Sequence, residues 1–128
     1  EITAGRTLQA EKLENYWLGS NKRYYGKALT VDKELASEWS RIPHFYTPFY
    51  VYKYATGYSA ATAFAAAILN GEEGAVEKYL GFLHAGGSDY SLNILKNAGV
   101  DLNTPQPVTV TLQKFAEKVA ELKKLLGK

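Results

Sequence analysis

The predicted fold is built around the stretch from Thr47 to Asn70, which reads TPFYVYKYATGYSAATAFAAAILN. Thr47 and Pro48 form a helix-start pair, because a threonine hydroxyl can cap free amide groups and proline is tolerated in the first helical turn. Alanines, which are strong helix formers, fill the second half of the stretch. These patterns predict a long helix from Pro48 to about Asn70, closed by Gly71. Its small side chains would let neighbouring helices approach closely.

Five further helices are predicted on either side of this stretch. Apolar residues recur there at steps of three and four, and candidate caps or glycine stops bound most of the segments. No alternation typical of paired strands separates them. The fold class predicted from these patterns is all-α, with about six helices. The five further segments are 7–25, 32–42, 72–85, about 89–98 and about 109–126.

Length and composition limit the classes of protein to which the chain can belong. A chain of 128 residues is one domain's worth of polypeptide, and 46% hydrophobic residues suffice for a folded core. A net charge of +2 is too small for a typical nucleic-acid binder. No apolar stretch reaches the roughly 18 residues of a membrane span. The absence of cysteine excludes disulfides and thiolate metal sites, and we expect a cytoplasmic protein without nucleic-acid or membrane partners.

The sequence contains no methionine, and we therefore expect that residue 1 is not an intact translation start. We expect the chain to be either a processed protein or part of a longer one, and we favour the second interpretation.

The unusual part of the sequence is the segment 41–54, RIPHFYTPFYVYKY. A neutral or protonated imidazole can donate a hydrogen bond beside the positive end of a helix, and tyrosine hydroxyls donate without any change of protonation. Such donors suit the stabilisation of developing negative charge. The structural alternative is that the imidazole packs a loop while the phenols tie helices together. The five candidates are His44, Tyr46, Tyr50, Tyr52 and Tyr54.

Other catalytic chemistries find no support in the sequence. His84 precedes two glycines at a helix end, where a structural role is expected. The two histidines are forty residues apart and no H-E-x-x-H motif is present, so we expect no metal site within this chain. There is also no G-x-S-x-G elbow and no phosphate-binding glycine loop.

Four strings carry a resemblance to a known family. They are RIPHFY followed by FYVYKYATGYSAA (41–46 and 49–61), GGS (86–88) and LKNAGVD (95–101). Together they resemble the C-terminal part of oligoendopeptidase F, a member of the thimet-oligopeptidase-like zinc peptidases. The likeness extends over nearly the whole chain. It implies that residues 1–128 form a single helical segment in the C-terminal subdomain of a larger zincin-type peptidase.

The resemblance also implies where the metal would be. In that family an H-E-x-x-H helix and a further glutamate hold zinc, all upstream of the region matched here. The intact enzyme would therefore contain zinc and hydrolyse oligopeptides, whereas this chain would hold no metal and would be inactive alone. Its expected partners are the oligopeptide substrate and the missing N-terminal part of the same protein.

The family's site residues can be carried over by position. A histidine followed by tyrosines helps to bind the substrate and to stabilise the tetrahedral oxyanion. His44 matches the histidine, and we expect His44 and Tyr50 to be catalytic. The spacing of the tyrosines differs between branches of the family, so the choice among them stays open. Tyr46, Tyr52 and Tyr54 are the expected substrate-binding residues.

An alternative function belongs to another class. The chain could be a stand-alone helical module whose aromatic face docks a partner peptide without catalysis. An upstream reading frame with H-E-x-x-H favours the peptidase, while a start and a stop codon flanking this segment favour the module.

Overall fold

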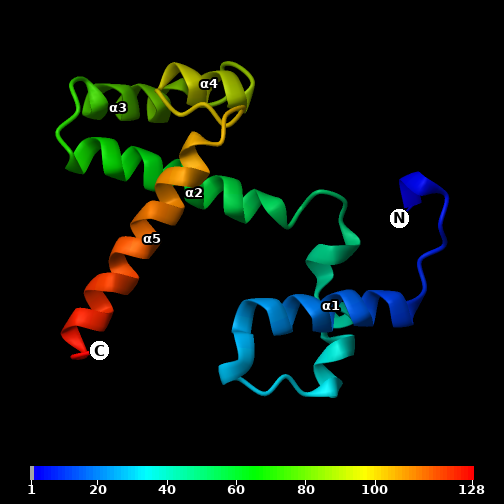
Figure 1. Ribbon diagram of the computed structural model, residues 1–128. Coiled ribbons are helices and arrows are strands. Elements are labelled where there is room, and N and C mark those ends of the chain that lie inside the picture. The colour runs from blue at the N-terminus through cyan, green and yellow to red at the C-terminus, as the bar shows by residue number, and fades with distance from the viewer. Residues whose placement is uncertain (1) are drawn as a thin grey trace. The chain divides into compact units, whose positions relative to one another are not determined.

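The computed structural model describes residues 2–128, and over this range it contains helices and turns without a strand (Figure 1). The all-α prediction is therefore confirmed. The chain divides into two compact units. The first unit ends at Val51 and the second begins at Tyr52. That residues 1–128 form a single helical segment of a larger domain stays a prediction. No helix within the described range is both long and apolar enough to cross a membrane.

The described residues of the first unit, 2–51, form one α-helix and four 3₁₀ segments. The helix α1 contacts η2 and η3, and η3 contacts η4. The bounds are η1 (Ile2–Ala4), α1 (Ala10–Tyr25), η2 (Gly26–Ala28), η3 (Lys33–Arg41) and η4 (Pro43–Tyr46).

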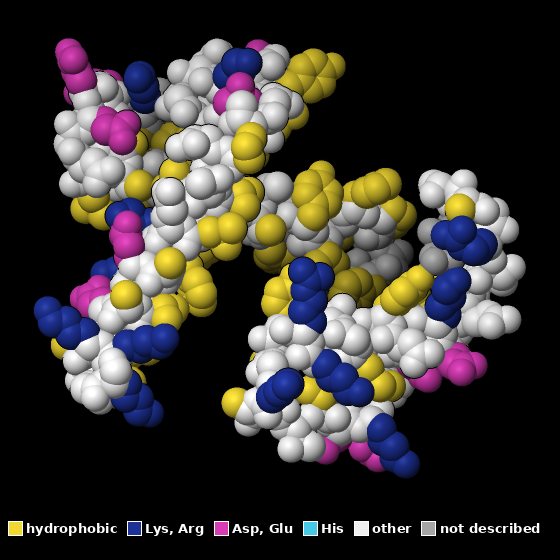
Figure 2. Space-filling model, viewed as in Figure 1, with side chains coloured by type: hydrophobic (Ala, Val, Ile, Leu, Met, Phe, Trp, Pro, Cys, Tyr) yellow, Lys and Arg dark blue, Asp and Glu magenta, His cyan; other side chains and the backbone are white. Residues whose placement is uncertain are grey.

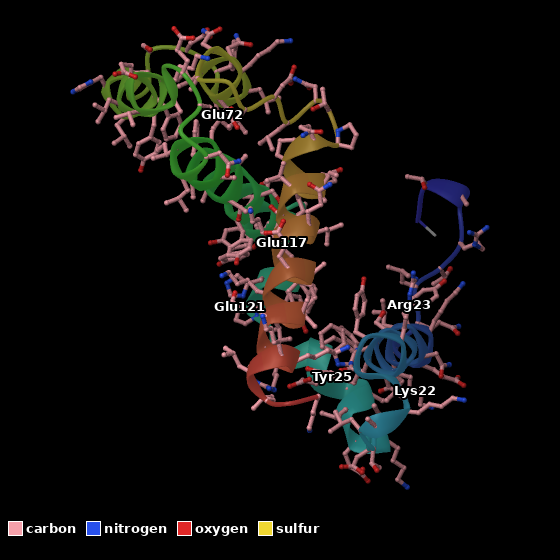
Figure 3. All side chains as sticks on the ribbon, turned by 60° about the vertical axis from the view of Figure 1, so that its left-hand side comes forward. Lys22, Arg23, Tyr25, Glu72, Glu117 and Glu121 are labelled. Carbon is pink, nitrogen blue, oxygen red and sulfur yellow. The ribbon has the colours of Figure 1, made fainter. Side chains whose placement is uncertain are left out.

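The ends of α1 follow from local chemistry. Glu11 lies in its first turn, while Lys22 and Arg23 lie in its last turn, so both ends suit the helix dipole. Figure 3 shows Lys22, Arg23 and Tyr25 together at this C-terminal end. Gly26 follows with φ 68°, a conformation that side-chain-bearing residues rarely adopt, and the α-helix ends there as predicted.

The second predicted helix is a 3₁₀ helix rather than an α-helix. Asp32 precedes it in an extended conformation, but its side chain forms no capping hydrogen bond. Within η3 the hydroxyl of Ser40 donates to the carbonyl of Ser37 at 2.7 Å, and Ser37 donates to Glu34. Both bonds run to carbonyls three residues earlier in the sequence, which is also the spacing of 3₁₀ backbone bonds.

Four α-helices build the second unit, in which α2 packs against α5 and α3, and α3 packs against α4. Figure 1 shows α5 crossing α2. A small core of Ala60, Phe64, Ala98 and Val100 lies between them. The bounds are α2 (Tyr52–Leu69), α3 (Ala75–Ala85), α4 (Ser91–Asn97) and α5 (Gln106–Leu125). The six predicted helices thus correspond to the five α-helices and η3.

Several helix boundaries differ from the prediction. The helix α2 begins at Tyr52 rather than at Pro48, because Phe49 has φ 59° and interrupts the helical conformation. At the other end, α5 begins at Gln106, about three residues early, with a proline in its first turn. The predicted stop after α2 is confirmed, since Gly71 has φ 69°.

Candidate functional site

A run of tight turns carries the histidine and tyrosine segment. The amide of Phe45 donates to the carbonyl of Ile42, and the amide of Thr47 donates to His44. The amide of Tyr50 then donates to Thr47 at 3.3 Å. Successive bonds between residues three apart wind this backbone tightly, so side chains distant in sequence meet in space.

His44 and Tyr50 are brought together by these turns. Their ring centroids are 5.1 Å apart and the ring planes are inclined by 39°. The side chain of His44 is exposed to solvent, and Tyr50 is 36% exposed. The pair therefore presents an imidazole and a phenol, two groups that can donate hydrogen bonds, side by side at an accessible surface.

Phe49 sits between these two side chains in the sequence and has φ 59°. Left-handed backbone at an aromatic residue is uncommon, and it concentrates where the surroundings impose a conformation. Because Phe49 is 82% exposed, packing of its own ring is a poor explanation for the conformation. The turn, rather than a helix start at Pro48, sets the position of Tyr50.

Tyr46 is held by a contact with the preceding segment. Its hydroxyl donates to the carbonyl of Ser40 at 2.6 Å, while its side chain remains 65% exposed. This bond ties η4 to η3. The hydroxyl of Tyr46 thus has a structural partner, whereas its ring remains accessible.

The structure also contains an aromatic anchor, the contact between Trp17 and Phe45, which the sequence did not predict. Trp17 of α1 meets Phe45 of η4 edge-on, with ring centroids 5.5 Å apart and planes at 80°. These rings, with Trp39 and Tyr46, line a mostly apolar cavity of about 440 Å³. The anchor holds η4 against α1 and so positions the neighbouring His44. Spacing along the sequence alone does not identify which aromatic residues meet in this way.

Tyr52 and Tyr54 lie in the first turn of α2, in the second unit. They are 57% and 60% exposed. Residues two apart on a helix point to different sides, so the two phenols lie on different faces of α2. Tyr52 lines a groove along α2, and the substrate-binding role of both tyrosines stays a prediction.

The described residues do not assemble a metal site. Over residues 2–128, no group of three His, Cys, Asp or Glu side chains gathers closely enough to hold an ion. A catalytic zinc needs at least three protein ligands.

Comparisons of this chain with known proteins agree on one family. A family model described as Peptidase family M3 matches residues 1–114. Oligopeptidase PepF of Bacillus subtilis is 48% identical over 124 residues, which are 97% of this chain and 18% of that protein. Group B oligopeptidase PepB of Streptococcus agalactiae is 40% identical over 124 residues, which are 97% of this chain and 21% of that protein.

A solved structure agrees with these sequences. The crystal structure of oligoendopeptidase-F from Enterococcus faecium matches with a TM-score of 0.92 and 42% identity. The match covers 99% of this chain and 24% of that one. The chain thus spans about a fifth of the length of the curated relatives, and the predicted family and helical fold are confirmed.

Proposed function

Because the chain belongs to peptidase family M3, we propose that it is the C-terminal part of a zinc-dependent metalloendopeptidase that hydrolyses oligopeptides in the cytoplasm. The names of its relatives, oligopeptidase and oligoendopeptidase, support a peptide substrate. Since the chain spans about a fifth of their length, most of the catalytic machinery belongs to the rest of the enzyme.

The zinc ligands belong to that remaining part in our proposal. The described residues offer no cluster of ligating side chains, so they do not fit the metal on their own. When bound, zinc supplies Lewis-acid chemistry to the intact enzyme. We propose that residues 1–128 alone are inactive.

The His44–Tyr50 ring pair is the observation that carries the proposal. During attack on a peptide bond, negative charge develops on the carbonyl oxygen. Two hydrogen-bond donors fixed beside each other stabilise that charge more than they stabilise the neutral substrate. A single donor of this kind contributes about 3 kcal/mol to lowering the barrier. The tight turns hold the two rings 5.1 Å apart before substrate arrives, which favours such a role.

The other tyrosines contribute to substrate binding in this proposal. Tyr52 and Tyr54 are exposed at the beginning of α2 and can donate to backbone carbonyls of a peptide. Tyr46 contributes its accessible ring, because its hydroxyl already donates to Ser40.

Comparing two proteins tests this function. One is the full-length product of the reading frame that contains this chain, and the other is the purified 128-residue chain. We expect an upstream H-E-x-x-H motif, bound zinc and oligopeptide hydrolysis in the full-length enzyme only. Hydrolysis by the 128-residue chain with bound zinc, or a complete reading frame without the motif, would overturn the proposal.

A further inference from the structure

An open groove of about 1110 Å³ runs along α2 in the second unit. Gly57, Ala61 and Ala65 line it at intervals of four residues, so they share one side of the helix. All three are exposed. Phe82 of α3 and Leu92 of α4 also line it. Figure 2 shows hydrophobic side chains gathered along α2.

The lining chemistry restricts what can occupy the groove. Lys53 is the single charged residue among the described side chains that line it. An apolar occupant is therefore favoured over a charged one. An apolar wall offers few hydrogen-bond partners, so a buried occupant must satisfy its own backbone groups, as a helix does. Small residues at intervals of four also allow a second helix to approach closely.

The chain exposes more surface than a self-contained fold of its size. Its accessible surface is 10326 Å². Two separate compact units of the observed lengths would together expose about 8,100 Å². The excess of about 2,200 Å² is as large as one side of an extensive permanent interface. No described side chain is less than 2% exposed, which agrees with a core that is incomplete.

We propose that the α2 groove receives an apolar helix from the part of the enzyme outside residues 1–128. This inference rests on the proposed function, because a longer enzyme must supply the helix. The relatives are long enough to do so, since the chain covers 18% of one and 24% of another. An occupant of the groove would bury the exposed side of α2 next to Tyr52. It would thereby fix the position of the beginning of that helix.

Cysteine labelling tests the proposal, because the chain has no native cysteine. Ala61→Cys and Ala65→Cys are made separately in the 128-residue chain and in the full-length enzyme, with any thiols outside this chain replaced by serine. Reaction with a thiol reagent is then followed with time. We expect prompt labelling of both variants in the short chain and at least tenfold slower labelling in the full-length enzyme.

Two controls accompany the variants. Glu77→Cys places a thiol on an exposed, charged position of α3 outside the groove, and it should label rapidly in both proteins. Labelling of the full-length variants in denaturant shows that each protected thiol is intact. Equal labelling in the two native proteins overturns the proposal.

Other occupants give different results that also overturn it. Protection that appears only with added oligopeptide identifies the substrate as the occupant. Protection in the short chain that grows with its concentration identifies a second copy. Peptide hydrolysis is measured on the same full-length samples. An active enzyme with an unprotected groove refutes the docking alone, whereas a protected but inactive enzyme refutes the proposed function.

Discussion

His44 and Tyr50 are six positions apart in the sequence, and only the turn between them brings their rings to 5.1 Å. Both residues are candidates from the sequence, through the aromatic density of the segment and the family resemblance, and their catalytic role stays a prediction. Their pairing was not predictable, because a helix start at Pro48 places Tyr50 on the helix. The left-handed conformation of Phe49, which no propensity scale favours for an aromatic residue, alters that geometry.

Removing one hydroxyl tests the part played by Tyr50. In the full-length enzyme, Tyr50→Phe keeps the ring beside His44 but deletes the donor. We expect kcat/KM for an oligopeptide to fall about 100-fold, mostly through kcat, because the lost bond strengthens in the transition state. Steady-state kinetics with a fluorogenic peptide measures the change.

Tyr46→Phe is the matched control for that experiment. Its hydroxyl donates to Ser40 within the protein, so its loss should lower stability with less than a fivefold change in kcat. Equal losses of kcat in the two variants would argue against a distinct role for Tyr50.

Replacing Phe49 tests whether its backbone conformation is strained. Phe49→Gly removes the steric cost of φ 59°, and little packing is lost from a side chain that is 82% exposed. We expect the 128-residue chain to gain about 1 kcal/mol in the free energy of unfolding. Phe49→Ala retains the cost and should give no gain. Denaturant titration of both variants measures the difference, and identical midpoints would show that the turn is unstrained.

At the level of elements, apolar periodicity predicted which segments are helical. It did so because an amphipathic helix carries its apolar residues on one face, which leaves a repeat of three and four in the sequence. The prediction of a helix at Lys33–Arg41 is confirmed, and the structure shows that this helix has the 3₁₀ form. On α5, Lys114 pairs with Glu117 and Lys118 pairs with Glu121, and Figure 3 shows the two glutamates one after the other along the helix.

The connection between α4 and α5 should make stability depend on acid pH. The amide of Asn103 donates to Asp101 at 3.0 Å, and Lys96 pairs with the same carboxylate at 3.0 Å. These contacts hold the pKa of Asp101 below its ordinary value of 3.8. The carboxylate therefore stabilises the fold above that value, and this contribution is lost as the pH falls through the lowered pKa.

Asp101→Asn measures this contribution. We expect the variant to be less stable than the parent at pH 7, and the difference to shrink as the pH falls below about 4. Midpoints of urea unfolding, measured at several pH values, give the stability of the variant and of the parent as a function of pH. A difference that stays constant with pH would show that the charge of Asp101 is not responsible.

At the scale of the whole molecule, the chain has the composition of a folded domain but a small core. The buried apolar residues of the second unit are few, and many large apolar side chains are exposed. In the first unit, the indole N–H groups of Trp17 and Trp39 are shielded from solvent without an acceptor among the described residues. Buried donors in complete proteins nearly always have partners. Composition could not reveal this deficit, because it does not specify which surfaces meet.

Replacing His44 in the full-length enzyme tests the central claim most directly. His44→Ala removes the proposed donor, and the ring contact with Tyr50 is lost with it. kcat/KM for an oligopeptide and the zinc content are measured on the same preparation. We predict a fall of about 100- to 1,000-fold in kcat/KM with zinc content unchanged. Unchanged kinetics, or a loss of activity that parallels a loss of zinc, would contradict the role assigned to this histidine.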